Sequence, residues 1–189
     1  MQITRPIILA SASKERLSIL KDEFQHPIQV LPANIDETPN KNETIDSLVK
    51  RLSYEKGKKI FNSNPNAYVL SADTLVESNG KPLGKPKNRD EAKSMMLSML
   101  DQKIQVWTSS CVFSQNHPSG ILQLDHAILY YKDLDPNSQL DFLQSEIWKN
   151  KAGGFSIQHD PCPVNLLNGD IYAVRGISLA FIKKILYTI

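Results

Sequence analysis

Apolar residues along this chain recur at two spacings, one typical of strands and one typical of helices. Short apolar runs bounded by turn residues predict strands, and residues that repeat every three or four positions predict helices. The strands expected on this basis are 6–10, 28–31, a run over 67–70 that ends near Asp73, 106–113, 121–131 and 171–174. An extended segment over 75–78 and a short apolar strand that ends at Gln158 are also expected. The expected helices are 14–24, 44–61, 89–100, 135–147 and 178–187, with Asn88 and Asp135 as the expected N-caps of the third and fourth. A turn is expected over 115–120.

The first strand leads through small residues into the first helix, with Ser13 as the expected N-cap. Lys14 and Arg16 fall in the first helical turn, where a cation opposes the helix dipole by about 0.3–1 kcal/mol. Two interpretations fit. A bound phosphate would compensate, because hydroxyls, backbone N–H groups and cations would converge on it. Otherwise this is a solvated basic turn.

A carboxylate follows the apolar run 67–70, at Asp73, and a Gly84-Lys85-Pro86 loop comes shortly after it. Reactive groups in α/β proteins lie at the ends of central strands. Asp73 and Lys85 on one rim would suit a phosphorylated substrate and a divalent cation. The alternative is that Asp73-Thr74 forms an Asx turn that ends the strand.

Lys56 lies on the apolar stripe of the helix expected over 44–61. A lysine in that position either snorkels to the edge of the core or aims its ammonium into a cleft. The pair Asp36-Glu37 precedes this helix and is either part of an ordinary loop or a contributor to a metal site.

The totals exclude several classes. With 189 residues, 41% hydrophobic and 22% charged, the chain is an ordinary globular protein of one domain or two small lobes. A net charge of +2 gives no basic field for nucleic acid. No apolar run approaches the length that spans a membrane, and the N-terminus is no convincing signal peptide.

Cys111 and Cys162 carry no C-x-x-C pattern, which favours free thiols in a reducing compartment and makes the cytoplasm the expected location. The four histidines have no metal-ligand spacing. A G-x-S-x-G elbow, a Walker-type loop and a G-x-G-x-x-G loop are all missing from the sequence.

Four short blocks occur in order along nearly the whole chain. They are Leu9-Ala10-Ser11-Ala12-Ser13 with Arg16 and Leu20; Asp36-Glu37 with Arg51-Leu52 and Lys56; Ala72-Asp73-Thr74 with Gly84-Lys85-Pro86; and Lys151-Ala152-Gly153-Gly154-Phe155 with Ile157-Gln158. Together they resemble the signatures of the Maf family of nucleoside triphosphate pyrophosphatases. The third and fourth blocks resemble the branch that acts on dTTP and UTP, rather than the sister branch associated with 7-methyl-GTP.

The resemblance implies a single Maf-like domain over 1–189, with a mixed, twisted α/β sheet flanked by helices and two lobes around a central cleft, as in inosine triphosphatases. It implies hydrolysis of nucleoside triphosphates to the monophosphate and pyrophosphate with a divalent metal, Mg²⁺ or Mn²⁺. It also implies a homodimer.

Carried over by position, the resemblance makes Asp73 the proton acceptor and Glu37 a second acid, with both as metal ligands. Lys56 and Lys85 would hold phosphate oxygens during catalysis. The substrate-binding positions are Ser11, Ser13 and Arg16 at the first helix, and Thr74 and Gln158 for nucleotide selection.

One departure bears on function. The family usually has Ser-Pro-Arg-Arg where this chain has Ser13-Lys14-Glu15-Arg16, so a cation associated with substrate choice is an acid here. Glu15 motivates an alternative, a nucleotide-binding regulatory protein with weakened catalysis. A nucleic-acid-binding module is disfavoured by the near-neutral charge and by the lack of an aromatic stacking cluster.

Overall fold

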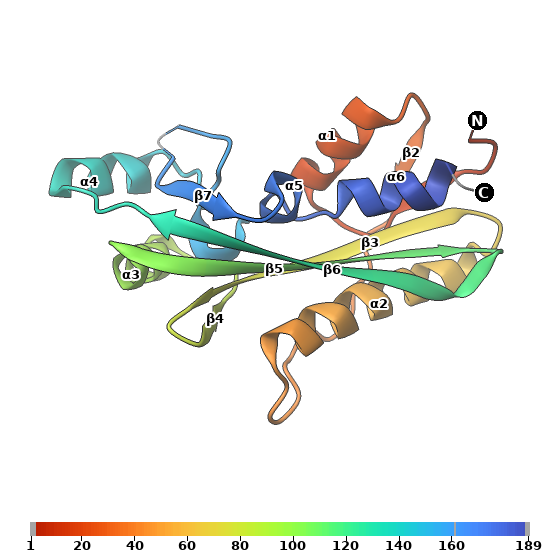
Figure 1. Cartoon of the computed structure of the whole chain (residues 1–189), viewed down its shortest axis with the longest axis horizontal. Helices are drawn as coiled ribbons and strands as arrows, with labels where there is room; N and C mark the ends of the chain where they lie inside the picture. The colour runs from red at the N-terminus through yellow and green to blue at the C-terminus, as the bar shows by residue number, and fades with distance from the viewer. Residues whose placement is uncertain (1–2, 161, 188–189) are drawn as a thin grey trace. The chain divides into compact units, whose positions relative to one another are not determined.

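The computed structural model describes residues 3–160 and 162–187 and divides into two compact units (Figure 1). The first unit contains the described residues up to Asp73, then Thr108–Asp125, then those from Gly176 onwards. The second unit contains Thr74–Trp107 and His126–Arg175. Three long strands supply residues to both units: β3 (Tyr68–Ser78), β5 (Gln102–Ser114) and β6 (His117–Tyr131).

In the first unit the strand order is β2-β1-β3-β5-β6. β1 (Ile7–Leu9) is parallel to β2 (Ile28–Val30) and to β3, with Ile7 opposite Ile28 on one side and Tyr68 on the other. Parallel neighbours need crossover connections, which α1 (Lys14–Glu23) and α2 (Ile45–Ser63) provide. α1 and α6 (Leu179–Tyr187) lie on one side of these strands and α2 on the other (Figure 1).

The helix α2 packs unusually close to the strands beneath it. Phe61 of α2 stacks on Phe113 of β5, and both are buried with Val69 and Cys111. A Cβ atom on Gly57 would lie 2.5 Å from Ser71 Oγ and 2.7 Å from the Phe113 ring. Glycine at this helical position therefore allows α2 to approach β3 and β5.

The second unit adds short elements to the other ends of the long strands. β4 (Lys81–Leu83) pairs antiparallel with β3, and β7 (Val164–Asn168) pairs antiparallel with β6. Its helices are α3 (Arg89–Met99), α4 (Pro136–Gln144) and α5 (Ile171–Val174), with a 3-10 turn, η1, over Ala152–Gly154. The methionines of α3 belong to its core, since Met96 and Met99 are buried with Phe142.

Most of the elements expected from the sequence are confirmed, including the N-caps Ser13, Asn88 and Asp135. The expected turn over 115–120 is too long, because β6 already begins at His117. Within the described residues, no helix is long and apolar enough to cross a membrane.

Two strand predictions near the C-terminus are wrong. The residues 171–174 form helix α5, because the side chain of Asp170 caps it by accepting a hydrogen bond from Tyr172 N at 2.8 Å. The chain is irregular at Gln158, where we expected a strand to end. β7 instead occupies the position beside β6, which the sequence pattern missed.

We expect Gly57→Ala to lower the free energy of unfolding by about 1–3 kcal/mol, because the added methyl group overpacks the contact with Ser71 and Phe113. This loss outweighs the gain of about 1 kcal/mol in helix propensity. Urea unfolding measures the difference. Gly84→Ala is the matched control, since no atom lies within 4 Å of a Cβ at Gly84. Equal stability of the two variants would contradict the close packing.

Candidate functional site

The centre of the candidate site is an ion pair between α2 and β3. Lys56 Nζ lies 2.6 Å from Asp73 Oδ1, and the two side chains are only 11% and 9% exposed. Asp73 lies inside the eleven-residue strand β3. The expectation that the strand ends at Asp73 is therefore wrong, and so is the alternative of an Asx turn at Asp73-Thr74. Lys56 does not snorkel away from the core, because its ammonium is buried against Asp73.

A second carboxylate reaches the same ammonium from a loop. Lys56 Nζ lies 2.8 Å from Oε1 of Glu37, whose side chain is 59% exposed. Its neighbour Asp36 has a local role, since Asp36 Oδ1 accepts a hydrogen bond from Thr38 N at 2.9 Å. That contact with Thr38 lowers the pKa of Asp36. Of the two adjacent acids, only Glu37 therefore joins Lys56 and Asp73.

Burial governs the acidity of Asp73. Desolvation raises the pKa of Asp73 above its ordinary value, and the attraction of Lys56 and then of Arg16 only partly offsets this effect. The negative charge of Glu37 adds to the increase. A carboxylate with a raised pKa holds a proton more readily and is a better general base.

The N-terminus of α1 is tied to β3 through one arginine. The hydroxyl of Ser13 caps the helix by accepting a hydrogen bond from Arg16 N at 3.3 Å. Arg16 Nη1 donates to Ser11 Oγ at 3.1 Å and to Ala72 O at 2.8 Å, while Nε donates to Gly176 O at 2.7 Å. Arg16 is therefore not part of a solvated turn, although Lys14 is exposed.

The pKa of Arg16 reflects its burial and the nearby acids. Burial lowers the pKa of the Arg16 guanidinium, and the negative charges of Asp73 and then Glu37 act in the opposite direction. Ser11, Arg16, Glu37, Lys56 and Asp73 thus gather into one charged group within the first unit.

Apart from Ser13, which caps α1 in the first unit, the remaining expected site residues belong to the second unit. Lys85 is exposed, and its neighbour Gly84 accepts a hydrogen bond at its carbonyl oxygen from Gly153 N at 2.9 Å. This bond brings together the Gly84-Lys85-Pro86 loop and the glycine pair of η1. Gln158 is exposed within a bend, and the side chains of Ser156 and His159 on either side of it are 2.7 Å apart. Thr74 follows Asp73 on β3 and is half-buried.

Sequence reasoning missed a set of buried hydroxyls behind the ion pair. Ser53 Oγ of α2 donates to Ser109 Oγ of β5 at 2.8 Å, and Ser71 Oγ of β3 donates to Ser53 O at 2.6 Å. The spacing of Ser71 and Asp73 could have indicated this position, because residues two apart on one strand share a face. A glycine within a long helix, at Gly57, was a second signal.

Two carboxylates that meet at one cation have the donor chemistry for a hard divalent metal. Mg²⁺ is typically held by one or two carboxylates together with substrate phosphates, rather than by a cage of protein ligands. Over residues 3–160 and 162–187, no three His, Cys, Asp or Glu side chains cluster as a metal site would require. Asp73 and Glu37 supply two carboxylates of the kind that Mg²⁺ accepts.

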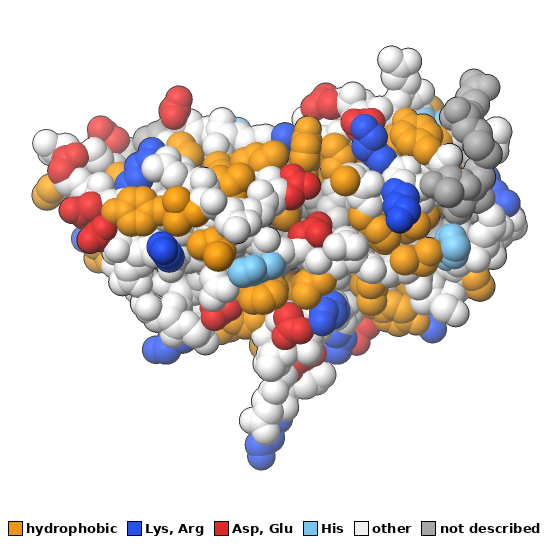
Figure 2. All heavy atoms as spheres, viewed as in Figure 1, with side chains coloured by type: hydrophobic (Ala, Val, Ile, Leu, Met, Phe, Trp, Pro, Cys, Tyr) orange, Lys and Arg blue, Asp and Glu red, His pale blue; other side chains and the backbone are white. Residues whose placement is uncertain are grey.

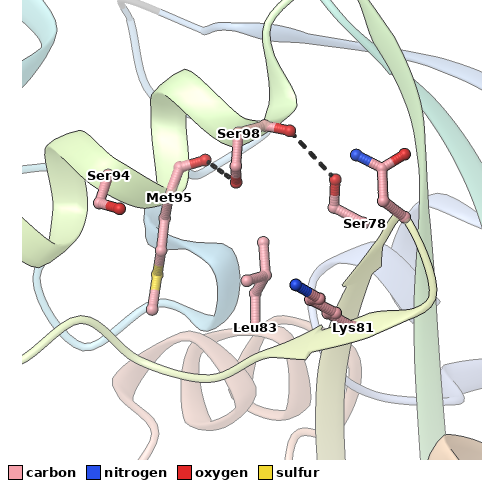
Figure 3. A pocket seen from close by; sticks show the side chains of 7 residues that line it. Ser78, Lys81, Leu83, Ser94, Met95 and Ser98 are labelled. Carbon is pink, nitrogen blue, oxygen red and sulfur yellow. Dashed lines mark hydrogen bonds between the residues drawn. The ribbon is translucent and has the colours of Figure 1, made fainter.

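A separate hollow of about 290 Å³ lies within the second unit, among β3, β4 and α3 (Figure 3). Two of its hydroxyls are bound to the backbone of α3, since Ser78 Oγ donates to Ser98 O and Ser98 Oγ donates to Met95 O. Lys81 is the one charged residue in its lining, which contains no acid. The hollow therefore lacks the groups that a hydrolytic site needs.

Comparison with known proteins gives consistent results. The Maf-like protein family matches residues 6–189. A dTTP/UTP pyrophosphatase of Wolbachia sp. subsp. Drosophila simulans (strain wRi) is 36% identical over 152 residues, which are 80% of this chain and 77% of that protein. A 7-methyl-GTP pyrophosphatase of Colwellia psychrerythraea (strain 34H / ATCC BAA-681) is 30% identical over 167 residues, covering 88% and 83% of the two chains.

Among solved structures, the Ham1 protein of Staphylococcus aureus matches with a TM-score of 0.50 and 13% identity, over 68% of this chain and 73% of that one. Because the sequence identity is so low, this match is evidence for a shared fold alone. It confirms the expected mixed α/β sheet flanked by helices.

We expect Asp73→Asn to become more stable relative to the parent protein as the pH rises. The pKa of Asp73 in the folded state is raised above its ordinary value of 3.8. Ionisation of Asp73 therefore destabilises the folded state, and the parent protein loses stability as the pH rises from the unfolded pKa to the folded pKa. Asparagine has no such ionisation. Melting temperatures measured from about pH 3 to 8 should show a difference that grows with pH. A difference that shrinks would mean that the attraction of Lys56 outweighs burial.

Proposed function

The chain belongs to the Maf family, and from this premise we propose that it is a nucleoside triphosphate pyrophosphatase that converts dTTP or UTP to the monophosphate and pyrophosphate. The observation that carries the proposal is Lys56 Nζ, held 2.6 Å from Asp73 and 2.8 Å from Glu37. Cleavage between the α- and β-phosphates needs an activated water and neutralised phosphate charge. The carboxylates of Asp73 and Glu37 can activate a water, and the ammonium of Lys56 can neutralise phosphate charge.

Asp73 is the proposed general base. Its raised pKa gives the carboxylate the basicity to take a proton from water that attacks the α-phosphorus. Its backbone is fixed in the interior of β3, which pairs with β1 on one side and β5 on the other. Fixed orientation matters because misplacement of a catalytic group by about 1 Å can cost 10²-fold in rate.

The cations of the group are the proposed phosphate ligands. When a triphosphate binds, Lys56 exchanges carboxylate contacts for phosphate oxygens, while Arg16 supplies fixed positive charge beside Asp73. Lys85 of the second unit is the further lysine proposed to hold phosphate. A Mg²⁺ or Mn²⁺ ion held by Asp73 and Glu37 would neutralise the charge that develops on the phosphate oxygens.

Base selection is proposed to involve Thr74 and Gln158. The amide of Gln158 can both donate and accept hydrogen bonds, which suits the edge of a pyrimidine. The two relatives described above are named for different substrates, dTTP/UTP and 7-methyl-GTP. We favour the pyrimidine nucleotides because the third and fourth sequence blocks resemble that branch.

The alternative function is nucleotide binding without turnover. Glu15 favours it, because this acid lies in the first turn of α1, next to the residues proposed to bind the triphosphate. A carboxylate there stabilises the helix dipole and repels phosphate.

Two further expectations complete the proposal. The free thiols Cys111 and Cys162 suit a reducing compartment, so we propose a cytoplasmic enzyme. We also propose a homodimer, which the family resemblance implies.

We expect the purified protein to release pyrophosphate from dTTP and UTP in the presence of Mg²⁺ or Mn²⁺. Asp73→Asn should lower kcat by about 10²–10⁴-fold, the usual contribution of a general base. A coupled pyrophosphate assay across a panel that includes dTTP, UTP, 7-methyl-GTP and ITP measures both results.

Asp22→Asn is the matched control for that experiment, because Asp22 is an exposed acid on α1 away from the charged group. Nucleotide binding by calorimetry without pyrophosphate release from any substrate would support the regulatory alternative. Turnover that survives Asp73→Asn would exclude Asp73 as the base.

A further inference from the structure

The loop that carries Glu37 is long and irregular. It runs over residues 31–44, between the end of β2 at Val30 and the start of α2 at Ile45. Connections of about this length without secondary structure are uncommon and are usually functional. The loop projects from the lower edge of the surface (Figures 1 and 2).

Three cations of α2 contact this loop. Lys59 Nζ donates to Asn34 O, and Lys56 Nζ pairs with Glu37. Arg51 Nη2 donates to Thr38 O at 3.0 Å. The order along the loop is the reverse of the order along α2, so the loop runs antiparallel to the helix.

Arg51 makes the most extensive of these attachments. Its Nε donates to Glu43 Oε1 at 2.7 Å and its Nη2 to Glu43 Oε2 at 2.9 Å, which is a two-point pairing of guanidinium and carboxylate. Glu43 Oε2 also accepts a hydrogen bond from Asn40 N at 2.9 Å, and this bond closes the tip of the loop. Arg51 therefore binds the loop on both sides of its tip, at Thr38 and at Glu43.

This attachment stays charged at any pH at which the enzyme would work. The hydrogen bonds from Arg51, and then the one from Asn40, lower the pKa of Glu43 to about 2. The same pairing raises the pKa of Arg51. Neither partner changes its charge near neutral pH.

We propose that Arg51 is a positioning residue, which fixes the loop so that Glu37 meets Lys56 beside Asp73. Thr38 directly follows Glu37, so the bond from Arg51 to Thr38 O sets the backbone from which the Glu37 side chain extends. A lysine cannot replace this arginine, because an ammonium is a point charge and cannot satisfy Glu43 at two points and Thr38 together. The proposal rests on the proposed role of Glu37 as a metal ligand.

The test compares Arg51→Lys and Glu43→Gln with the parent protein. Residues that orient metal ligands typically alter metal affinity by about 10–100-fold. We therefore expect both variants to weaken Mn²⁺ binding by about tenfold, measured by electron paramagnetic resonance on protein saturated with a non-hydrolysable nucleotide. Hydrogen exchange of the backbone amides over 36–43 should be faster in both variants.

Lys50→Gln is the matched control, because Lys50 is a cation on the same helix whose ion pair is with Asp46 and not with the loop. It should leave Mn²⁺ binding and loop exchange unchanged. The proposal is overturned if Mn²⁺ binding by Arg51→Lys and Glu43→Gln stays within about twofold of the parent, or if loop exchange is unaltered. Glu43→Gln decides the outcome if Arg51→Lys does not fold. Absence of pyrophosphate release from the parent would instead reject the proposed function, since the exchange measurement does not depend on turnover.

Discussion

The contact between Lys56 and Asp73 is the constraint on which the site depends, and it is set by how closely α2 packs on β3. Lysine at this position could extend in several directions, but the helix lies so near the strand that its ammonium meets Asp73 at 2.6 Å. Gly57, the next residue, allows that approach. The hydrogen bond from Ser71 Oγ to Ser53 O then fixes helix and strand at the same level. Packing and site chemistry are thus two consequences of one interface.

The same interface also buries two opposite charges, since Lys56 and Asp73 are only 11% and 9% exposed. Burying two charges removes their hydration, and a buried pair recovers that loss only with excellent geometry. The raised pKa of Asp73 indicates that the recovery is incomplete. A phosphorylated substrate with its metal would satisfy the ammonium and the carboxylates separately. Such residual instability is expected where binding and catalysis, rather than folding, select the residues.

Much of the fold could be predicted from the sequence, because its helices have regular apolar stripes and clear caps, such as Ser13 and Asp135. The predictions failed where local pattern and tertiary pairing compete. The apolar segment 171–174 resembles a strand, but Asp170 caps it as a helix and β7 occupies the position beside β6. Strand pairing is a long-range property, which a local pattern does not contain.

The candidate site divides in the same way. The sequence identified Asp73, Lys56, Glu37 and Arg16 as residue types in family blocks, and the structure brings these four together. The sequence could not indicate that the Arg16 guanidinium donates hydrogen bonds to Ala72 O and Gly176 O. Every residue has a backbone carbonyl, so the residue types do not show which carbonyl will accept a bond.

The two acids beside Lys56 are held by different kinds of structure, and this difference bears on how they act. Asp73 is part of a central strand, so its position is fixed by the sheet. Glu37 is part of an irregular loop, and its position depends on side-chain contacts from α2. A general base must be positioned accurately before the substrate arrives, whereas a metal ligand must adapt as the ion enters with its phosphates. The rigid position of Asp73 therefore suits its proposed role as base as well as metal ligand, and the loop position of Glu37 suits a metal ligand alone.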